Sequence, residues 1–151
     1  MKAISKKSLA APLMAAFLSL FVTGTAAAAD TYYDVTVQTG WHKHAGTDAT
    51  IYVTIYGTRG NTRRYPLTIP HYDDNERGKK TTYTFKSPRD IGRITKVVAY
   101  NSYDNKDGPG WQLNHMRVGK AGYRLTHFPC NRWLATPGKT TRILYPNRRC
   151  R

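Results

Sequence analysis

Acidic side chains are scarce in this chain: 9 Asp and Glu stand against 24 Lys and Arg, which gives a formal net charge of +15. So basic a protein attracts polyanions, such as acidic lipid head groups, nucleic acid or acidic polysaccharide. A simpler interpretation is that the charge only keeps the protein soluble. Charge therefore indicates a class of partner and says nothing about the fold.

Catalytic motifs are also lacking. The chain has no Gly-x-Ser-x-Gly elbow, no Walker loop, no His-Glu-x-x-His and no closely spaced pair of carboxylates in an apolar setting. His42 and His44 are two positions apart, but a zinc or copper site needs at least three converging ligands and no spacing here promises a third. We therefore predict a protein that is not an enzyme and requires no cofactor.

Only one long apolar run occurs, and it lies at the start of the chain. Lys2, Lys6 and Lys7 precede the run Leu9–Val22, and small residues at 27–29 follow it. This order is typical of a secretory signal peptide, and the run is too short for a membrane helix, which needs roughly 20 apolar residues. We expect residues 1–29 to be removed and residues 30–151 to form one secreted domain, extracellular or periplasmic, with no transmembrane segment.

Helical periodicity is lacking after residue 30. Short runs of alternating apolar and polar residues instead recur about every ten positions, separated by turns rich in Gly, Pro, Asn and Asp. The predicted strands cover residues 33–38, 50–56, 63–69, 81–85, 93–100, 111–118, 123–128 and 140–145. This pattern predicts an all-β fold, an antiparallel β-sandwich, whose core includes Trp111 and Trp133.

Cysteine is nearly absent, with Cys130 and Cys150 the only two. An even pair in an exported protein predicts a disulfide. The bond would fix the basic C-terminal tail, residues 146–151, to the body of the domain.

Four ordered motifs carry a family resemblance. The first comprises Tyr33, Val35, Val37, Thr39, Gly40, Ala45, Gly46, Thr47, Asp48, Ala49, Tyr56 and Gly57. The others are Glu76–Gly78 with Tyr83–Phe85, then Asp90–Val97, and finally Gly108–Leu113 with Phe128–Leu134. Together they resemble the PLAT domain, also called the lipoxygenase homology domain. The resemblance implies a sandwich of two four-stranded sheets and a role in docking on lipid or protein.

Relatives in this family bind calcium through loop oxygens at one end of the sandwich. The matching positions here are Gly46 and Asp48, together with Asp104, Asn105 and Asp107 in a later loop. Trp41 stands where the family has its first aspartate, and cationic residues surround it. Since calcium takes six to eight oxygen ligands, we expect at most weak calcium binding.

The loop between the first two predicted strands offers a membrane contact instead. Trp41, His42, Lys43 and His44 place an exposed indole among cations, the set of side chains that settles at a bilayer interface. Further basic residues are Arg59, Arg63, Arg64, Arg77, Lys79 and Lys80. We expect a monomeric binding module that docks on an anionic lipid surface or an acidic protein. The alternatives are a binder of nucleic acid or acidic polysaccharide, with nucleic acid the less favoured, and an effector or inhibitor of a protein partner.

Overall fold

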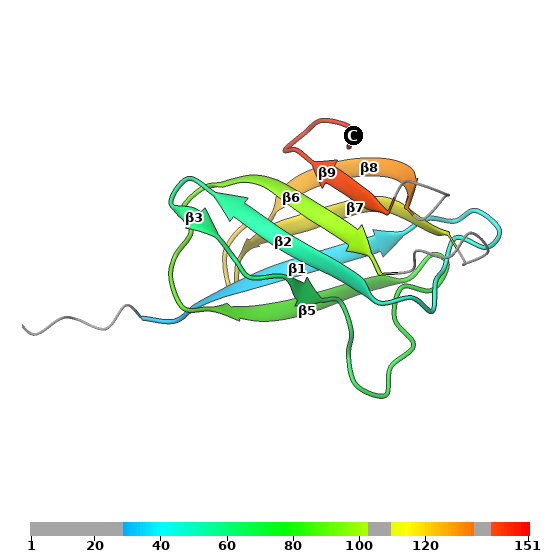
Figure 1. Ribbon diagram of the computed structural model, residues 1–151, viewed down its shortest axis with the longest axis horizontal. Helices are drawn as coiled ribbons and strands as arrows, with labels where there is room; N and C mark the ends of the chain where they lie inside the picture. Colours follow the sequence, from blue (N-terminus) through cyan, green and yellow to red (C-terminus); the bar gives the residue numbers. More distant parts are fainter. Residues whose placement is uncertain (1–28, 103–109, 135–139) are drawn as a thin grey trace, which may run out of the picture.

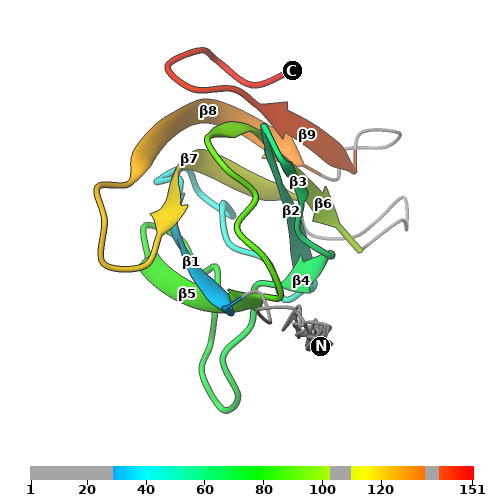
Figure 2. The same ribbon diagram turned by 90° about the vertical axis from the view of Figure 1, so that its left-hand side faces the viewer.

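The computed structural model describes residues 29–102, 110–134 and 140–151, and these form two antiparallel sheets packed face to face (Figures 1 and 2). The first sheet has the order β5 (Lys80–Ser87), β1 (Thr31–Thr39), β7 (Trp111–Lys120) and β8 (Thr126–Leu134). The second has the order β3 (Gly60–Asn61), β2 (Ile51–Gly57), β6 (Ile94–Asn101) and β9 (Thr141–Leu144), and β4 (Tyr65–Pro66) also pairs with β2. The predicted all-β sandwich is confirmed.

The core lies between the sheets and follows the alternation of the sequence. Val35 and Val37 of β1 face Ile51, Val53 and Ile55 of β2, and all five are at most 1% exposed. Successive side chains of a strand point to opposite faces, so apolar residues spaced by two line one buried surface. No part of the described chain forms a helix with the length and apolar character that crossing a bilayer demands.

Three sequence predictions need correction. The strand expected at 63–69 is only two residues long, as β4. The second sheet has five strands, where four were expected. Pro66 lacks the N–H that a continued ladder requires, which confines this segment to a sheet edge. Trp133, predicted for the core, is half-buried, because its neighbour Leu134 points inward and adjacent strand residues face opposite sides. Trp111, whose position in the core is confirmed, donates its indole N–H to the Thr39 hydroxyl at 3.0 Å.

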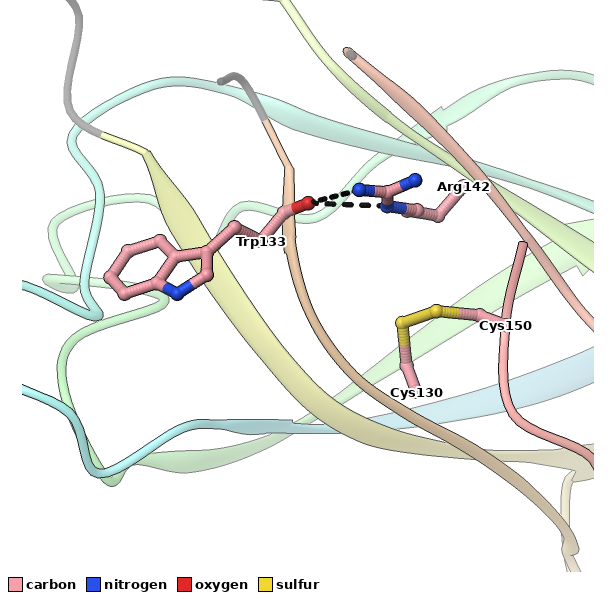
Figure 3. The surroundings of a disulfide bond; sticks show 4 residues. All are labelled: Cys130, Trp133, Arg142 and Cys150. Carbon is pink, nitrogen blue, oxygen red and sulfur yellow. Dashed lines mark hydrogen bonds between the residues drawn. A yellow bond between two sulfur atoms is a disulfide. The ribbon is translucent and has the colours of Figure 1, made fainter.

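The disulfide between Cys130 and Cys150 is confirmed and joins β8 to the C-terminal tail (Figure 3). Main-chain hydrogen bonds hold the same tail: Asn147 N–H donates to the His127 carbonyl, and Arg151 exchanges two bonds with Ile143 of β9. Beside the disulfide, the Arg142 guanidinium donates two hydrogen bonds to the Trp133 carbonyl (Figure 3). The tail thus covers an edge that the two sheets would otherwise leave open.

A polar network closes the end of the sandwich where β1 begins. The Asp90 carboxylate accepts hydrogen bonds from the Lys120 ammonium, the Gly92 N–H and the Tyr33 hydroxyl, and it pairs with Arg59 at 2.8 Å. The Lys120 hydrogen bond and the Gly92 N–H hold the pKa of Asp90 well below its ordinary range. This network belongs to the scaffold, and it lies at the end opposite the Trp41 loop.

Candidate functional site

The loop of residues 40–50 connects β1 to β2 at the end of the sandwich opposite the Asp90 network, and main-chain hydrogen bonds hold it in place (Figure 1). Gly40 N–H donates to the Gln112 carbonyl at 2.8 Å, and Gln112 N–H donates to the Ala45 carbonyl at 2.9 Å. Ala45 is completely buried. A loop anchored at both Gly40 and Ala45 can present the side chains between them in a fixed arrangement.

Trp41 is the most exposed aromatic of this loop, with 72% of its surface accessible. Its ring lies against Gly78, where an added Cβ would come within 2.4 Å of the indole. Gly78 also has a φ of +70°, a conformation that glycine adopts without strain, and its N–H donates to the Gly40 carbonyl at 2.9 Å. Glycine at position 78 therefore provides a flat seat for an indole whose other face is open to solvent.

His42, which follows Trp41 in the chain, contacts a second tryptophan, Trp133. The two rings are tilted, with centroids 6.5 Å apart, and they come from the loop and from the end of β8. His42 is exposed and Trp133 half-buried. The sequence did not predict that Trp133 faces outward. Its position next to Leu134, which points inward, would have indicated this, because adjacent strand residues face opposite sides.

A second loop, residues 67–79, projects from the sandwich next to the first one (Figures 1 and 2). Gln38 fixes its end by donating from its side-chain amide to the Gly78 carbonyl at 3.0 Å. Asp74 orders its interior, since one carboxylate oxygen accepts the Ile69 N–H at 2.6 Å and the other accepts the Tyr83 hydroxyl at 3.1 Å. Burial and the nearby Asp74 charge raise the pKa of Tyr83 well above its ordinary value, so this phenol stays a donor.

Three carboxylates converge where the two loops meet. Asp48, Asp73 and Glu76 each place an oxygen within 4.8 Å of the others. In the described part of the chain this is the only group of three or more His, Cys, Asp or Glu side chains arranged to hold a metal ion, so His42 and His44 acquire no third ligand there. Hard oxygen ligands suit calcium.

The prediction for this site identified only part of the cluster. Gly46 and Asp48 lie in it, and an added Cβ at Gly46 would come within 3.1 Å of Glu76 Oε2. The other predicted ligands, Asp104, Asn105 and Asp107, lie outside the described residues. Sequence reasoning missed Asp73, which lies in a stretch interpreted as a turn, and Glu76, which was identified only as part of a family motif.

Cations line the same depression as the carboxylates. Its walls are formed by Lys43, His44, Gly46, Thr47, Asp48, Glu76 and Arg77. Positive charges near a cation site oppose the ion, while three carboxylates favour it. The donor set therefore fits calcium, with an affinity that the basic neighbours reduce.

The basic residues named from the sequence are distributed over several parts of the surface. Arg77 and Lys79 lie with the two loops, and the Lys79 ammonium sits 4.8 Å from the centre of the Tyr72 ring. The others are elsewhere: Arg59 pairs with Asp90, Arg63 covers Tyr65, Arg64 covers Tyr100, and Lys80 lies on β5.

Comparisons with known proteins agree with this architecture. The sequence profile of the PLAT/LH2 domain matches residues 33–145. The allene oxide synthase-lipoxygenase protein of Plexaura homomalla is 35% identical over 118 residues, which is 72% of this chain and 11% of that protein. Human lipoxygenase homology domain-containing protein 1 is 33% identical over 108 residues, 70% of this chain and 5% of that one.

Solved structures show the same similarity to lipoxygenases. Coral 8R-lipoxygenase, whose crystal structure is described in terms of calcium activation via a C2-like domain, superposes with a TM-score of 0.67 at 33% identity, over 76% of this chain and 17% of the enzyme. This chain spans only a small fraction of the length of each relative, so the match concerns their PLAT portion and leaves the remainder of the lipoxygenase chains uncovered. Because the family profile covers most of its length, the chain belongs to the PLAT/LH2 domain family.

Proposed function

We propose that this protein is a secreted, non-catalytic module that docks on anionic lipid surfaces through the Trp41 loop. The observation that carries the proposal is the indole of Trp41, 72% exposed yet fixed on the glycine seat at position 78. Main-chain hydrogen bonds anchor the loop that carries this exposed indole, and Lys43 and Arg77 lie on the same two loops, so an apolar ring is presented together with cations.

The side chains around Trp41 suit an anionic interface. Indole is amphipathic and settles at the depth of lipid head groups, while Lys43 and Arg77 can reach phosphate oxygens. Each basic residue near an anionic membrane surface contributes about 1 kcal/mol, so two or three give measurable binding when added to the indole. An acidic protein partner would use the same cations and would also cover the indole, since Trp is common at protein interfaces, but it would not make the protein float with vesicles.

Calcium has a supporting role in this proposal. Asp48, Asp73 and Glu76 would hold the ion next to the Trp41 loop, where it would reduce the negative charge of the loops that face the membrane. Because Lys43 and Arg77 already supply positive charge there, binding to vesicles should depend only weakly on calcium.

Secretion belongs to the same proposal. Residues 1–29 have the composition of a signal peptide, and the disulfide between Cys130 and Cys150 requires an oxidising compartment to persist. Sequencing the amino terminus of exported protein tests this point, with Asp30 expected as the first residue.

Vesicle flotation tests the docking proposal. Protein covering residues 30–151 should float with vesicles of phosphatidylcholine and phosphatidylserine and remain at the bottom with phosphatidylcholine alone. Addition of calcium should strengthen flotation no more than a few-fold relative to chelator. The proposal fails if the protein ignores both kinds of vesicle, or if it binds neutral and anionic vesicles equally at low salt, because the cations beside Trp41 would then contribute nothing.

A further inference from the structure

The outer face of the first sheet carries a second basic surface, separate from the Trp41 loop. We name it the basic sheet face and define it by Lys80 of β5, His115 and Arg117 of β7, Arg124 of the β7–β8 turn, and His127 of β8. None of these residues is needed for the proposed lipid docking. Lys80 was predicted as part of a basic surface, whereas the other four were not, because the five residues are up to 47 positions apart in the chain.

Strand register brings these residues together. Arg117 and His127 are direct cross-strand partners, as are Thr36 and Arg117, and in the next row Lys80, Gln38 and His115 lie side by side across three strands. Rows on one face are two residues apart, about 6.5 to 7 Å, which lets side chains of adjacent rows touch. The rings of His115 and His127 do so, with centroids 4.9 Å apart.

The face is hollowed at its end near the β7–β8 turn. One depression is lined by Arg117, Arg124, Leu125 and His127, and the adjoining one by Arg124 to His127 together with Asn147 of the tail. The disulfide and the hydrogen bond from Asn147 N–H to the His127 carbonyl hold that tail in place. An anionic group entering here would meet guanidinium and imidazole groups from two strands and a turn.

Within the described part of the chain, these basic side chains have no carboxylate partner. None of the five forms an ion pair with a carboxylate of the described residues. The acid on this face is Asp34, whose carboxylate accepts the Thr84 hydroxyl at 2.7 Å. Uncompensated positive charge concentrated on one surface is what attracts a polyanion.

His115 makes the charge of the face depend on pH. Burial lowers the pKa of His115 below its ordinary value of 6.5, and the charges of His127, Arg117 and Lys80 lower it further. His115 Nδ1 is engaged by the Asn114 side-chain oxygen at 2.7 Å, so its second nitrogen is the one that gains a proton. A bound anion would favour that proton, and by linkage protonation would favour the anion.

The composition of the face decides which polyanion fits. The two rows around His115 and Arg117 contain Lys, Gln, Thr, His, Arg and Pro but no Trp, Tyr or Phe. Single-stranded nucleic acid is bound by stacking its bases on such aromatic rings, and sequence readout of a duplex needs an element that enters a groove. A sulfated polysaccharide needs only charge and hydrogen-bond donors.

We propose that the basic sheet face binds a sulfated polysaccharide, with sulfate groups held by Arg117, Arg124 and the histidine pair, and that binding tightens as the pH falls from 7.5 to 5.5. The face runs along the side of the sandwich, whereas the loop of residues 40–50, which carries Trp41, lies at one end (Figure 1). A molecule docked on a membrane by that end would still present the basic sheet face, so the two surfaces can be occupied together.

Calorimetric titration with heparin tests the proposal. The Arg117→Gln, Arg124→Gln variant should lose roughly tenfold or more in affinity, and its salt dependence should decrease by about two counterions. The Arg63→Gln, Arg64→Gln variant is the matched control, because it removes the same charge from exposed arginines outside this face. An equal loss in both variants would show that heparin responds only to net charge and would overturn the proposal.

The pH dependence is tested with the His115→Gln, His127→Gln variant. Wild type should bind heparin several-fold more tightly at pH 5.5 than at pH 7.5, and the variant should bind equally at both. A variant that keeps the full pH dependence refutes the role of the histidines, and single-stranded DNA that binds wild type as tightly as heparin refutes the choice of polysaccharide. Amide shifts of wild type during a heparin titration give a readout without substitution, and shifts confined to the Trp41 loop would also overturn the assignment.

Discussion

Replacing Trp41 by alanine should separate membrane binding from stability in this protein. The indole rests on the Gly78 seat with one face only, and 72% of its surface remains accessible. Removing it takes away most of what the loop offers to a lipid surface. The anchors at Gly40 and Ala45 are main-chain hydrogen bonds, which the substitution leaves intact.

The magnitudes of the two effects follow from the exposed and covered parts of the side chain. Moving a large apolar side chain out of water gives about 1.5 to 3 kcal/mol, so Trp41→Ala should weaken vesicle binding by about 10- to 100-fold. Only about a quarter of the indole is covered in the free protein, so the free energy of unfolding should fall by about 1 kcal/mol or less. Truncating a fully buried Trp would instead cost about 3 to 5 kcal/mol.

Vesicle flotation and thermal melting on the same preparations provide the assay. Tyr123 offers a matched control, because it is 73% exposed and lies in the turn after β7, at the opposite end of the sandwich. Tyr123→Ala should leave binding to phosphatidylserine vesicles unchanged. If Trp41→Ala and Tyr123→Ala weaken flotation equally, the loop does not orient the protein on the membrane. A large drop in the melting temperature of Trp41→Ala would refute the claim that the indole contributes little to stability, because it would show that the indole covers the end of the sandwich.

Three further predictions concern the scaffold. Replacing Cys130 and Cys150 by serine should reduce the free energy of unfolding in urea by about 3 kcal/mol, since the bond closes a loop of 20 residues, and an unchanged unfolding midpoint would contradict this. Asp90→Asn should lower the melting temperature at neutral pH. The difference from wild type should shrink as the pH falls below 3.8, the ordinary pKa of the carboxyl, toward its depressed pKa in the folded state. A difference independent of pH would count against the network. Thr39→Val should cost about 1 to 3 kcal/mol by depriving the buried Trp111 indole N–H of its acceptor, whereas Thr39→Ser should restore most of the melting temperature.

The predicted strands that survive in the structure are those with a clear period of two. Val35 and Val37, like Ile51, Val53 and Ile55, are buried as their spacing predicts. The segment 63–69 failed because its few apolar residues are interrupted by proline, and a lone edge pairing cannot extend past a residue without an N–H. Trp133 is not in the core, because it is adjacent to the inward-facing Leu134 and adjacent residues of a strand point to opposite faces.

In the candidate sites, too, some features could be predicted from local sequence and others could not. The exposed indole of Trp41 could be predicted because its loop neighbours are polar and small, and local composition controls exposure in a loop. The partners of Asp48 could not, because Asp73 and Glu76 are 25 and 28 positions away and reach it only through the packing of two loops.

The sequence by itself determined the all-β class, the disulfide and the Trp41 loop, because each depends on alternation, parity or composition within short stretches. The tertiary structure alone decided which charged groups act together. Arg59 pairs with Asp90. One face of the first sheet carries Lys80, His115, Arg117 and His127. The physical reason is register: a shift of one residue in any of these strands would turn its side chains to the other face, and the sequence of one strand does not state how it aligns with its neighbours.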